Sequence, residues 1–285
     1  MRKIIFVGLI VMVAFCAVAA EKVVLAEMGT ATWCTNCPIA YEALDNVAAN
    51  HPGAVITCRY YDDAEFGNDA ADARLAFYSV HSYPTTYFDG SYYLAGTQSE
   101  DVDGLTALYE NLFQQAFAEG APVAVEITAL DIEAGTATIS VTAETDIEAG
   151  FYSVYFMVAE DGLSHNGHEY NDVCRIAEEV GSFTAMAADE NQVFTAEFAW
   201  DAAWDAEHCQ AIACVQETIS RHVLQAAAAN LTPAENAPVA TQHEWTLSNY
   251  PNPFNPETNI EFSVPVGGRV SLKIYNVAGQ LVKVL

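Results

Sequence analysis

Two cysteines, Cys34 and Cys37, stand at the junction between an apolar strand and an amphipathic helix. They belong to the run Trp33-Cys34-Thr35-Asn36-Cys37-Pro38, which opens a helix predicted over residues 38–50. The free amides and the dipole of a helix N-terminus stabilise a thiolate, and a thiolate attacks disulfides. Two intervening residues place Cys37 one turn along, where it can resolve a mixed disulfide. The motif predicts a redox-active pair, and a static disulfide or half of a zinc site are the alternatives.

Residues 21–119 alternate between strand-like and helix-like runs. The predicted order is strand, helix, strand, helix, strand, strand, helix, which implies a compact sheet with helices on both faces. The predicted strands cover residues 22–28, 54–61, 85–88 and 91–94, and the predicted helices cover residues 38–50, 69–78 and 101–119. Asp89 and Gly90 form the tight turn of a hairpin. We therefore predict an α/β domain over residues 20–119.

Residues 120–226 change character, because short alternating strands with turn signals between them replace the helices. This pattern predicts an all-β, immunoglobulin-like antiparallel sandwich. Its predicted strands cover residues 123–128, 136–142, 151–159, 193–198 and 211–216. Residues 227–246 are predicted to be an Ala/Pro/Asn-rich linker, and a partial β module follows over residues 247–285. Three strands alone have little core, so we expect this last module to be incomplete.

The N-terminus has the composition of a secretory signal peptide over residues 1–19. Arg2 and Lys3 form a short basic region, an apolar run follows over residues 4–18, and Ala17-Val18-Ala19 fits a cleavage site. The apolar run is too short to favour a membrane span, and no other segment is long and apolar enough for one. The sequence predicts an exported protein with no membrane span after leader removal.

The formal net charge of −28 at pH 7 limits the partners of the chain. So acidic a surface repels nucleic acid and anionic lipid, and we exclude both as main partners. The acidic cluster at residues 62–72 could hold calcium through carboxylate oxygens, but it lacks the alternating spacing and the turn glycine of a calcium loop. We therefore predict no metal and no cofactor.

Tyr83-Pro84-Thr85 precedes a predicted strand about 50 residues after the cysteine motif. With that motif and the Asp89-Gly90 turn, it makes residues 21–119 resemble the thioredoxin superfamily. The resemblance implies that Pro84 is a cis proline facing the redox pair. It also implies that Cys34 attacks, that Cys37 resolves, that Trp33 shields the pair, and that Trp33, Tyr83, Pro84 and Thr85 line a substrate groove.

The chain departs from the thioredoxin pattern at one place. Thioredoxins bury an acidic residue six positions before the first cysteine, and here that position is Met28, with Glu27 beside it. If Glu27 points the other way, proton transfer to Cys37 lacks this helper. The Thr35-Asn36 dipeptide matches neither the reducing thioredoxins nor the strong oxidants, so the direction of electron flow stays open.

Two further resemblances concern the rest of the chain. Residues 21–226 resemble the outer-membrane-protein-twenty-eight-related family, through the runs at residues 168–175 and 211–217. The segment from Asn249 resembles type nine secretion sorting modules and flagellar-hook-capping-type immunoglobulin-like modules, through residues 250–256 and 270–279. These resemblances imply a secreted or cell-surface, outer-membrane-associated protein of a Gram-negative-type envelope, with attachment through the C-terminal module.

The remaining cysteines after the leader give weaker predictions. Cys58 sits in an apolar strand and is predicted to be a buried, inert thiol. Cys209 and Cys214 lie five residues apart on one predicted strand, and an odd separation puts their side chains on opposite faces. Cys174 could bond either of them as a staple of the sandwich.

These observations predict an exported thiol–disulfide exchange protein that acts on protein thiols or disulfides in the cell envelope. Cys34 and Cys37 would carry the reaction. The rival interpretation is a non-enzymatic surface protein for binding or structure, in which the thioredoxin-like domain is a scaffold and the cysteine pair a permanent disulfide. Met28 in place of a buried acid favours this rival.

Overall fold

The computed structural model describes residues 20–231 in full, together with four short strands between residues 246 and 284. The predicted signal peptide, residues 1–19, lies outside the described residues, and so do residues 232–245 of the predicted linker. Residues 20–231 belong to one compact unit, and the four terminal strands belong to another.

The amino-terminal region, residues 20–119, follows the predicted order of elements. Its strands and helices are β1 (Val24–Thr30), α1 (Cys37–Asn50), β2 (Val55–Tyr61), α2 (Asp69–Tyr78), β3 (Thr85–Phe88), β4 (Tyr92–Ala95) and α3 (Val102–Ala118). β1 pairs with β2 in parallel and with β3 antiparallel, and β3 and β4 form a hairpin. The hairpin turns at Asp89 and Gly90, which both have positive φ. The predicted element boundaries differ from the observed ones by at most two residues.

Local capping explains where the helices of this region begin. The side chain of Asn68 accepts a hydrogen bond from the Ala71 N–H at the start of α2, and Asp101 does the same for the Gly104 N–H at the start of α3. Each bond satisfies a first-turn donor that the helix itself leaves without a partner. α1 instead carries a proline in its first turn, where a missing amide costs nothing.

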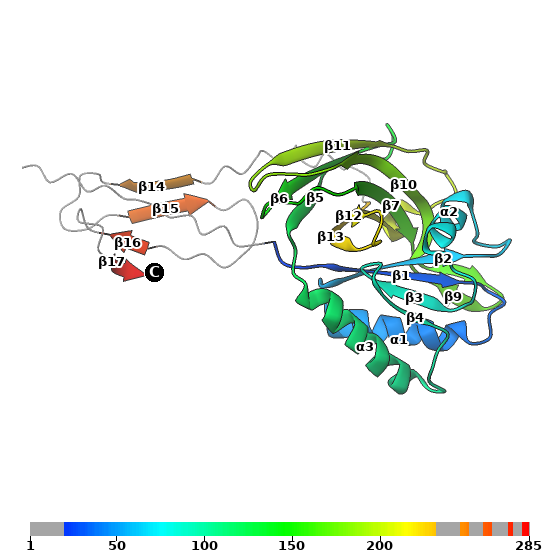
Figure 1. Ribbon diagram of the computed structural model, residues 1–285. Coiled ribbons are helices and arrows are strands. Elements are labelled where there is room, and N and C mark those ends of the chain that lie inside the picture. Colours follow the sequence, from blue (N-terminus) through cyan, green and yellow to red (C-terminus); the bar gives the residue numbers. More distant parts are fainter. Residues whose placement is uncertain (1–19, 232–245, 251–258, 264–272, 276–280, 285) are drawn as a thin grey trace, which may run out of the picture. The chain divides into compact units, whose positions relative to one another are not determined.

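Helices cover both faces of this part of the sheet, as predicted (Figure 1). α1 and α3 lie side by side on one face, where they pack against Val24, Ala26 and Met28 of β1. α2 lies on the other face and packs against Leu25 of β1 and Ile56 of β2. The alternation follows from the two-residue period of a strand. We call these two surfaces the α1 face and the α2 face.

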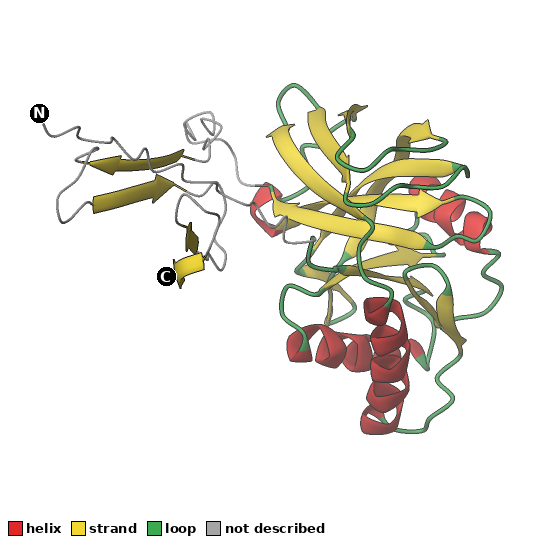
Figure 2. Ribbon diagram, turned by 60° about the vertical axis from the view of Figure 1, so that its left-hand side comes forward, coloured by secondary structure: helices red, strands yellow, loops and turns green. Residues whose placement is uncertain are grey.

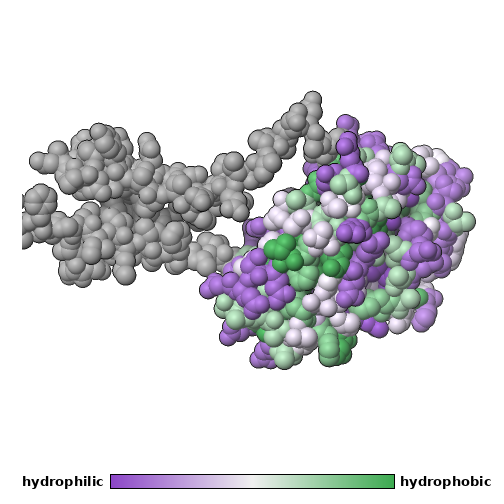
Figure 3. Space-filling model, turned by 90° about the horizontal axis from the view of Figure 1, so that it is seen from above, coloured by the Kyte–Doolittle hydropathy of each residue, from purple (hydrophilic) through white to green (hydrophobic). Residues whose placement is uncertain are grey.

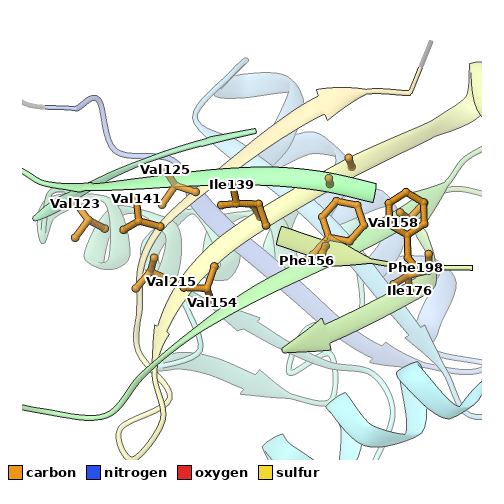
Figure 4. Close-up of a cluster of buried hydrophobic side chains, with 14 of the residues drawn as sticks. Val123, Val125, Ile139, Val141, Val154, Phe156, Val158, Ile176, Phe198 and Val215 are labelled. Carbon is orange, nitrogen blue, oxygen red and sulfur yellow. The ribbon is translucent and has the colours of Figure 1, made fainter. Parts of the chain in front are cut away.

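The β-rich region, residues 120–231, holds strands and one short 3₁₀ turn. Its strands are β5 (Val123–Asp131), β6 (Thr136–Ala143), β7 (Tyr152–Glu160), β8 (Leu163–His165), β9 (His168–Tyr170), β10 (Val173–Phe183), β11 (Asn191–Glu197), β12 (Cys209–Glu217) and β13 (Val223–Asn230), and the turn is Ala206–His208. β11, β6 and β5 form a three-stranded sheet that packs over β7, β10 and β12. Figure 4 shows the apolar side chains that meet between these layers, where Phe156 and Phe198 stack with 5.0 Å between ring centres.

The two regions share one mixed sheet of eight strands, where the sequence predicted two separate domains. Its order is β13-β12-β7-β10-β2-β1-β3-β4. Figure 2, in which strands are yellow and helices red, shows how much of this part of the chain is strand. β10 joins β2 in parallel at the pair Val173 and Arg59, and the Arg59 N–H donates to the Asp172 carbonyl at 2.7 Å. An uncovered β2 would expose unpaired backbone groups, and β10 covers part of that edge. The fold is therefore mostly β and is built on a large mixed sheet.

The alternation of apolar and polar residues did not predict two strands of this sheet, β10 and β13. β10 carries bulges after Cys174 and after Glu179, and a bulge interrupts the two-residue period. β13 contains four consecutive alanines, residues 226–229, which have low strand propensity. Residues 227–246 were predicted to be a linker, whereas β13 extends to Asn230 and the next strand begins at Thr246. Pairing with β12 overrides the local preference of the alanines.

The terminal strands form two antiparallel pairs. They are β14 (Thr246–Tyr250) with β15 (Asn259–Ser263), and β16 (Lys273–Tyr275) with β17 (Leu281–Val284). On the visible face of the compact unit, hydrophilic and hydrophobic residues are interspersed (Figure 3). Among the described residues, none of the helices has the length and the apolar character that a membrane span needs.

Candidate redox site

The site lies where β1 ends and α1 begins. Cys34 and Cys37 are joined by a disulfide, with 5.4 Å between their Cα atoms. The Cys34 N–H donates to the Ala31 carbonyl at 3.1 Å, which closes the turn between the strand and the helix. Cys34 keeps 9% of its surface exposed, and Cys37 keeps none. The pair is therefore asymmetric, because an incoming sulfur can approach only Cys34.

The start of α1 favours negative charge on the exposed sulfur. Cys37 is the first residue of the helix, and the first turn contains no acidic side chain. Asn36 precedes it, and its side chain makes no capping hydrogen bond to the first turn. Within the first turn of α1, no carboxylate or cap oxygen offsets the positive end of the helix dipole, which stabilises a thiolate once the disulfide is open.

Two aromatic rings frame the disulfide. Tyr83 packs against the cysteines, and Trp33 meets the Tyr83 ring edge to face with 5.9 Å between ring centres. Trp33 is 64% exposed, so the frame opens to solvent. Asp62 holds both rings, since its carboxylate accepts from the Tyr83 hydroxyl at 2.8 Å and its carbonyl accepts from Trp33 Nε1 at 3.4 Å. Burial and the bond to Asp62 raise the pKa of Tyr83, which keeps the hydroxyl protonated as a donor.

Further hydrogen bonds hold the segment between β1 and α1. Asp63 Oδ2 accepts from the Thr32 N–H at 2.6 Å, directly before the motif. The hydroxyl of Tyr41, one turn into α1, lies 2.5 Å from the hydroxyl of Thr30 at the end of β1. The strand end and the helix start are thus tied together on both sides of the cysteines.

Sequence reasoning missed Asp62, Asp63 and Tyr41 as parts of this site. A signal for the aspartates was present, because they directly follow the second predicted strand. The ends of two neighbouring parallel strands meet at one edge of a sheet, so side chains after β2 lie beside the loop after β1. Tyr41 carries no such signal, because a tyrosine on an amphipathic helix is usually part of the core.

The predicted cis proline is confirmed, since the Tyr83–Pro84 peptide bond is cis. Pro84 and Thr85 are both buried, and Thr85 Oγ1 donates to the Ser82 carbonyl at 2.7 Å. Tyr83 and Trp33 are the predicted groove residues that reach solvent. Pro84 and Thr85 are therefore closed to solvent, and the two aromatic rings are the open part of the predicted groove.

No acid occupies the position six residues before Cys34. Met28 is completely buried on the α1 face. Glu27 points to the α2 face, where its Oε1 accepts from Arg74 Nε at 3.0 Å and from the Tyr60 hydroxyl at 2.7 Å, and its Oε2 accepts from the Tyr78 hydroxyl. The side chains of Glu27 and Arg74 are 1% and 3% exposed. The carboxylate of Glu27 is thus engaged in a sealed network, turned away from the helix that holds Cys37.

The other cysteines of the described part, Cys58, Cys174, Cys209 and Cys214, are buried thiols. The predicted burial of Cys58 is confirmed. Cys209 and Cys214 face different cores, as their spacing predicted. The structure does not bring Cys174 to either of them, because β7 lies between β10 and β12. In residues 20–231, no three His, Cys, Asp or Glu side chains gather as ligands for a metal ion.

The comparison with protein families identifies the C-terminal segment. Residues 248–284 match the secretion system C-terminal sorting domain. The match falls on the segment whose resemblance predicted type nine sorting, and such a domain directs export and attachment at the cell surface. The protein is therefore exported and associated with the cell surface. A search of curated proteins gives no match.

Two of the solved structures with a similar fold come from Porphyromonas gingivalis and Agrobacterium tumefaciens. HBP35 of Porphyromonas gingivalis has a TM-score of 0.60 and 16% identity, over 92% of this chain and 90% of that one. Protein AGR_C_4864 of Agrobacterium tumefaciens has a TM-score of 0.53 and 16% identity, over 76% of this chain and 97% of that one. At these identities the similarity shows the fold alone.

A third structure bears on the predicted family of the first two regions. It is a domain of the outer membrane lipoprotein Omp28 from Porphyromonas gingivalis, with a TM-score of 0.27 and 12% identity, over 39% of this chain and 89% of that one. A TM-score this low carries no argument about the fold. The predicted relation to this family therefore stays a prediction.

Proposed function

We propose that this protein exchanges disulfides with protein thiols or disulfides of the cell envelope, through a thioredoxin-like domain at residues 20–119. One observation carries the proposal. The Cys34–Cys37 disulfide opens α1 with only Cys34 exposed, and Tyr83, which precedes the cis proline, packs against it. Because the sorting domain directs the chain to the cell surface, the partners are secreted or surface proteins.

The reaction needs no group beyond the two cysteines and the partner. In the reduced protein, the Cys34 thiolate attacks one sulfur of a partner disulfide, and the other partner sulfur leaves as a thiolate. The Cys37 thiolate then attacks Cys34 Sγ, which releases the second partner sulfur and forms the Cys34–Cys37 bond. Two electrons pass to the partner. The reverse steps oxidise a partner dithiol, so the reduction potential of the pair sets the direction.

The backbone beside the cis bond offers a place for an extended partner segment. Among the hydrogen bonds of residues 20–231, none uses the backbone N–H or C=O of Tyr83. A partner strand can pair with these groups while its side chains contact the exposed Trp33 ring. This arrangement would hold the partner sulfur near Cys34, where exposure permits attack.

Replacement of the attacking sulfur tests the proposal. In an insulin reduction assay, Cys34→Ser should lower the rate to that of the uncatalysed reaction. Cys37→Ser should stop after the first step and accumulate a mixed disulfide, which mass spectrometry detects. Cys214→Ala, which removes a buried thiol on β12, should leave the rate unchanged. A Cys34→Ser variant as active as the unsubstituted protein would rule out the mechanism.

A second candidate function rests on Met28, because a buried apolar side chain stands where thioredoxins keep an acid. In this interpretation the amino-terminal region is a scaffold with a permanent disulfide, and the protein binds or supports other surface molecules. The potential of the pair, measured in glutathione and dithiothreitol buffers, separates the two functions. A value well below about −300 mV indicates a permanent bond, and a value between about −270 and −120 mV supports exchange.

A further inference from the structure

Two more thiols meet where the two regions join. Cys58 of β2 is 0% exposed and Cys174 of β10 is 1% exposed, and both belong to the apolar cluster beneath α2. The Cys174 thiol donates to the Ile176 carbonyl of its own strand at 3.5 Å. We propose that Cys58 and Cys174 are a second cysteine couple, which oxidises to a disulfide across the junction of β2 and β10. This inference does not depend on exchange activity at Cys34.

The register of the junction brings the two sulfurs together. β2 and β10 pair only at Arg59 and Val173, and Cys58 precedes the first of these residues while Cys174 follows the second. The side chains therefore face each other diagonally across neighbouring strands, and diagonal neighbours lie about 7–8 Å apart, at the upper limit for a disulfide. β10 bulges directly after Cys174, and this irregular backbone can adjust when the sulfurs move from contact to bonding distance.

The two sides of the junction are held differently. On the α1 face, Arg59 pairs with Asp45 of α1 and with Asp172, which lies 3.5 Å away. On the α2 face, Asn68 Nδ2 donates to the Cys174 carbonyl at 2.8 Å, and the two thiols fill the space below. A disulfide there would add a covalent link on the side that has no ion pair across the junction.

Geometry excludes the other possible partners of Cys174. Cys214 belongs to the same apolar cluster, but β12 is separated from β10 by β7. Two strand spacings amount to about 9–10 Å, which exceeds the reach of about 7 Å between the Cα atoms of a disulfide. Cys209 lies on the same distant strand and faces the other core. Cys58, on the strand next to β10, is thus the cysteine that the fold places nearer to Cys174.

The oxidation is a thiol–disulfide exchange with an envelope disulfide as the oxidant. One thiolate of the couple attacks the oxidant, a mixed disulfide forms, and the second thiolate closes the Cys58–Cys174 bond. Two electrons and two protons leave the couple, and the oxidant becomes two thiols. The contact with Cys174 and burial raise the pKa of Cys58 well above its usual value, so the folded protein holds little thiolate. The bond should therefore form while the chain folds, before α2 seals the junction.

Peptide mapping of the full chain tests the proposal without a change at either cysteine. The Cys34→Ser/Cys37→Ser double variant is refolded in oxidised and reduced glutathione, alkylated and digested with trypsin. Cleavage after Lys22, Arg59, Arg74 and Arg175 leaves Cys58 in peptide 23–59 and Cys174 in peptide 75–175. We expect these two peptides to be disulfide-linked, while peptide 176–221, with Cys209 and Cys214, is alkylated. Recovery of Cys58 and Cys174 as alkylated thiols, or a link to peptide 176–221, would overturn the proposal.

Thermal unfolding of the same double variant gives an independent measurement. Because the bond would close a loop of more than 100 residues, oxidation should raise the unfolding midpoint by about 10 °C. The shift should vanish when Cys58→Ala and Cys174→Ala are added, and it should persist when Cys214→Ala is added. An equal midpoint in the oxidised and reduced forms would contradict the link.

Discussion

The two faces of the sheet differ in chemistry at neighbouring residues of one strand. On the α1 face, Met28 packs into an apolar layer, and the disulfide at the start of α1 meets solvent at Cys34. On the α2 face, Glu27 enters a sealed polar network. Cys58 and Cys174 lie on this second face without access to solvent. A single strand therefore separates an accessible redox site from a buried polar layer.

The polar layer of the α2 face links the two regions of the chain. Arg74 of α2 binds Glu27 of β1, and its NH1 donates to Gln216 Oε1 of β12 at 3.0 Å. Gln216 Nε2 in turn donates to the Tyr78 hydroxyl at 2.8 Å. A buried ion pair loses its hydration, so it is tolerated only where such bonds satisfy its donors and acceptors. Glu27 lies one position away from where thioredoxins keep their buried acid. Here it belongs to a network that holds the two regions together, and it is turned away from Cys37.

The largest expected difference is in the free energy of unfolding, when one buried arginine is replaced on each face. Arg74 and Arg59 both have side chains that are 3% exposed, but the partner of Arg74 is 1% exposed and the partner Asp45 of Arg59 is 52% exposed. Arg74→Met should lower the free energy of unfolding by about 3–5 kcal/mol, because Glu27 then keeps a buried charge. Arg59→Met should lower it by less, about 1–2 kcal/mol, because Asp45 can be hydrated and the second partner, Asp172, is 21% exposed. Urea unfolding measures both.

The same two variants test whether the α2 face takes part in exchange. At 25 °C, the insulin reduction rate per folded molecule should be unchanged in Arg74→Met, because Glu27 and its partners make no contact with the disulfide. Equal losses of stability in both arginine variants would remove the distinction between the faces. A large loss of rate in Arg74→Met would show that the network serves the redox pair after all.

The pH dependence of stability sharpens the comparison at the ion pair of the α1 face. Burial raises the pKa of Asp172 from an ordinary 3.8 to about 6, against the opposing effect of Arg59. Between these values the folded chain binds the proton more tightly than the unfolded chain. The stability from this group is therefore complete below pH 4 and is lost as the pH rises to about 6. Relative to Asp172→Asn, the unfolding free energy should fall by about 2 kcal/mol from pH 4 to pH 7.

A carboxylate with the opposite shift provides the control for this pH series. Hydrogen bonds from the Ala187 backbone and from Gln192 lower the pKa of the exposed Glu190. Its contribution is present above its unfolded pKa and is lost as the pH falls, so the Glu190→Gln difference should change in the other direction. For each variant, the difference in unfolding free energy from the unsubstituted protein is followed against pH. If the differences for Asp172→Asn and Glu190→Gln changed in the same direction, the opposite pKa shifts of the two groups would be contradicted.

The smallest expected difference in unfolding free energy is between variants of two helix caps. Asn68 caps α2 and also donates to the Cys174 carbonyl of β10, whereas Asp101 caps α3 alone. Asp101→Ala should cost about 1 kcal/mol of unfolding free energy. Asn68→Ala should cost about 2 kcal/mol, since it removes a cap and a partly buried hydrogen bond across the junction. Equal costs in urea unfolding would mean that the bond from Asn68 to the Cys174 carbonyl adds nothing to the join of the two regions.

The parts of the fold that the sequence predicted are those specified locally. α2 begins and ends as predicted because Asn68 marks its start, and the β3–β4 hairpin follows from the turn at Asp89 and Gly90. The shared sheet depends instead on pairing between residues more than 100 positions apart, such as Arg59 and Val173. No local pattern encodes that contact, and bulges hide the period of β10.

The candidate site divides in the same way. The cysteine pair was predicted from its residue types and spacing, and the cis proline from the resemblance to the thioredoxin superfamily. The role of Asp62 depends on where the loop after β2 meets the loop after β1, which only the folded sheet decides. The face of the sheet to which Glu27 points also depends on strand register. A shift of one residue would place Glu27 on the α1 face and Met28 on the α2 face.

The hydrogen-bonded junction of β10 and β2 has a consequence for how the protein handles a partner. The amino-terminal and β-rich regions are not independent domains joined by a flexible linker, because one sheet runs through both. A protease that cuts between α3 and β5 would nick the chain without releasing either piece. If the proposed exchange takes place at Cys34, a bound polypeptide would meet the β-rich region in a fixed orientation relative to the amino-terminal region.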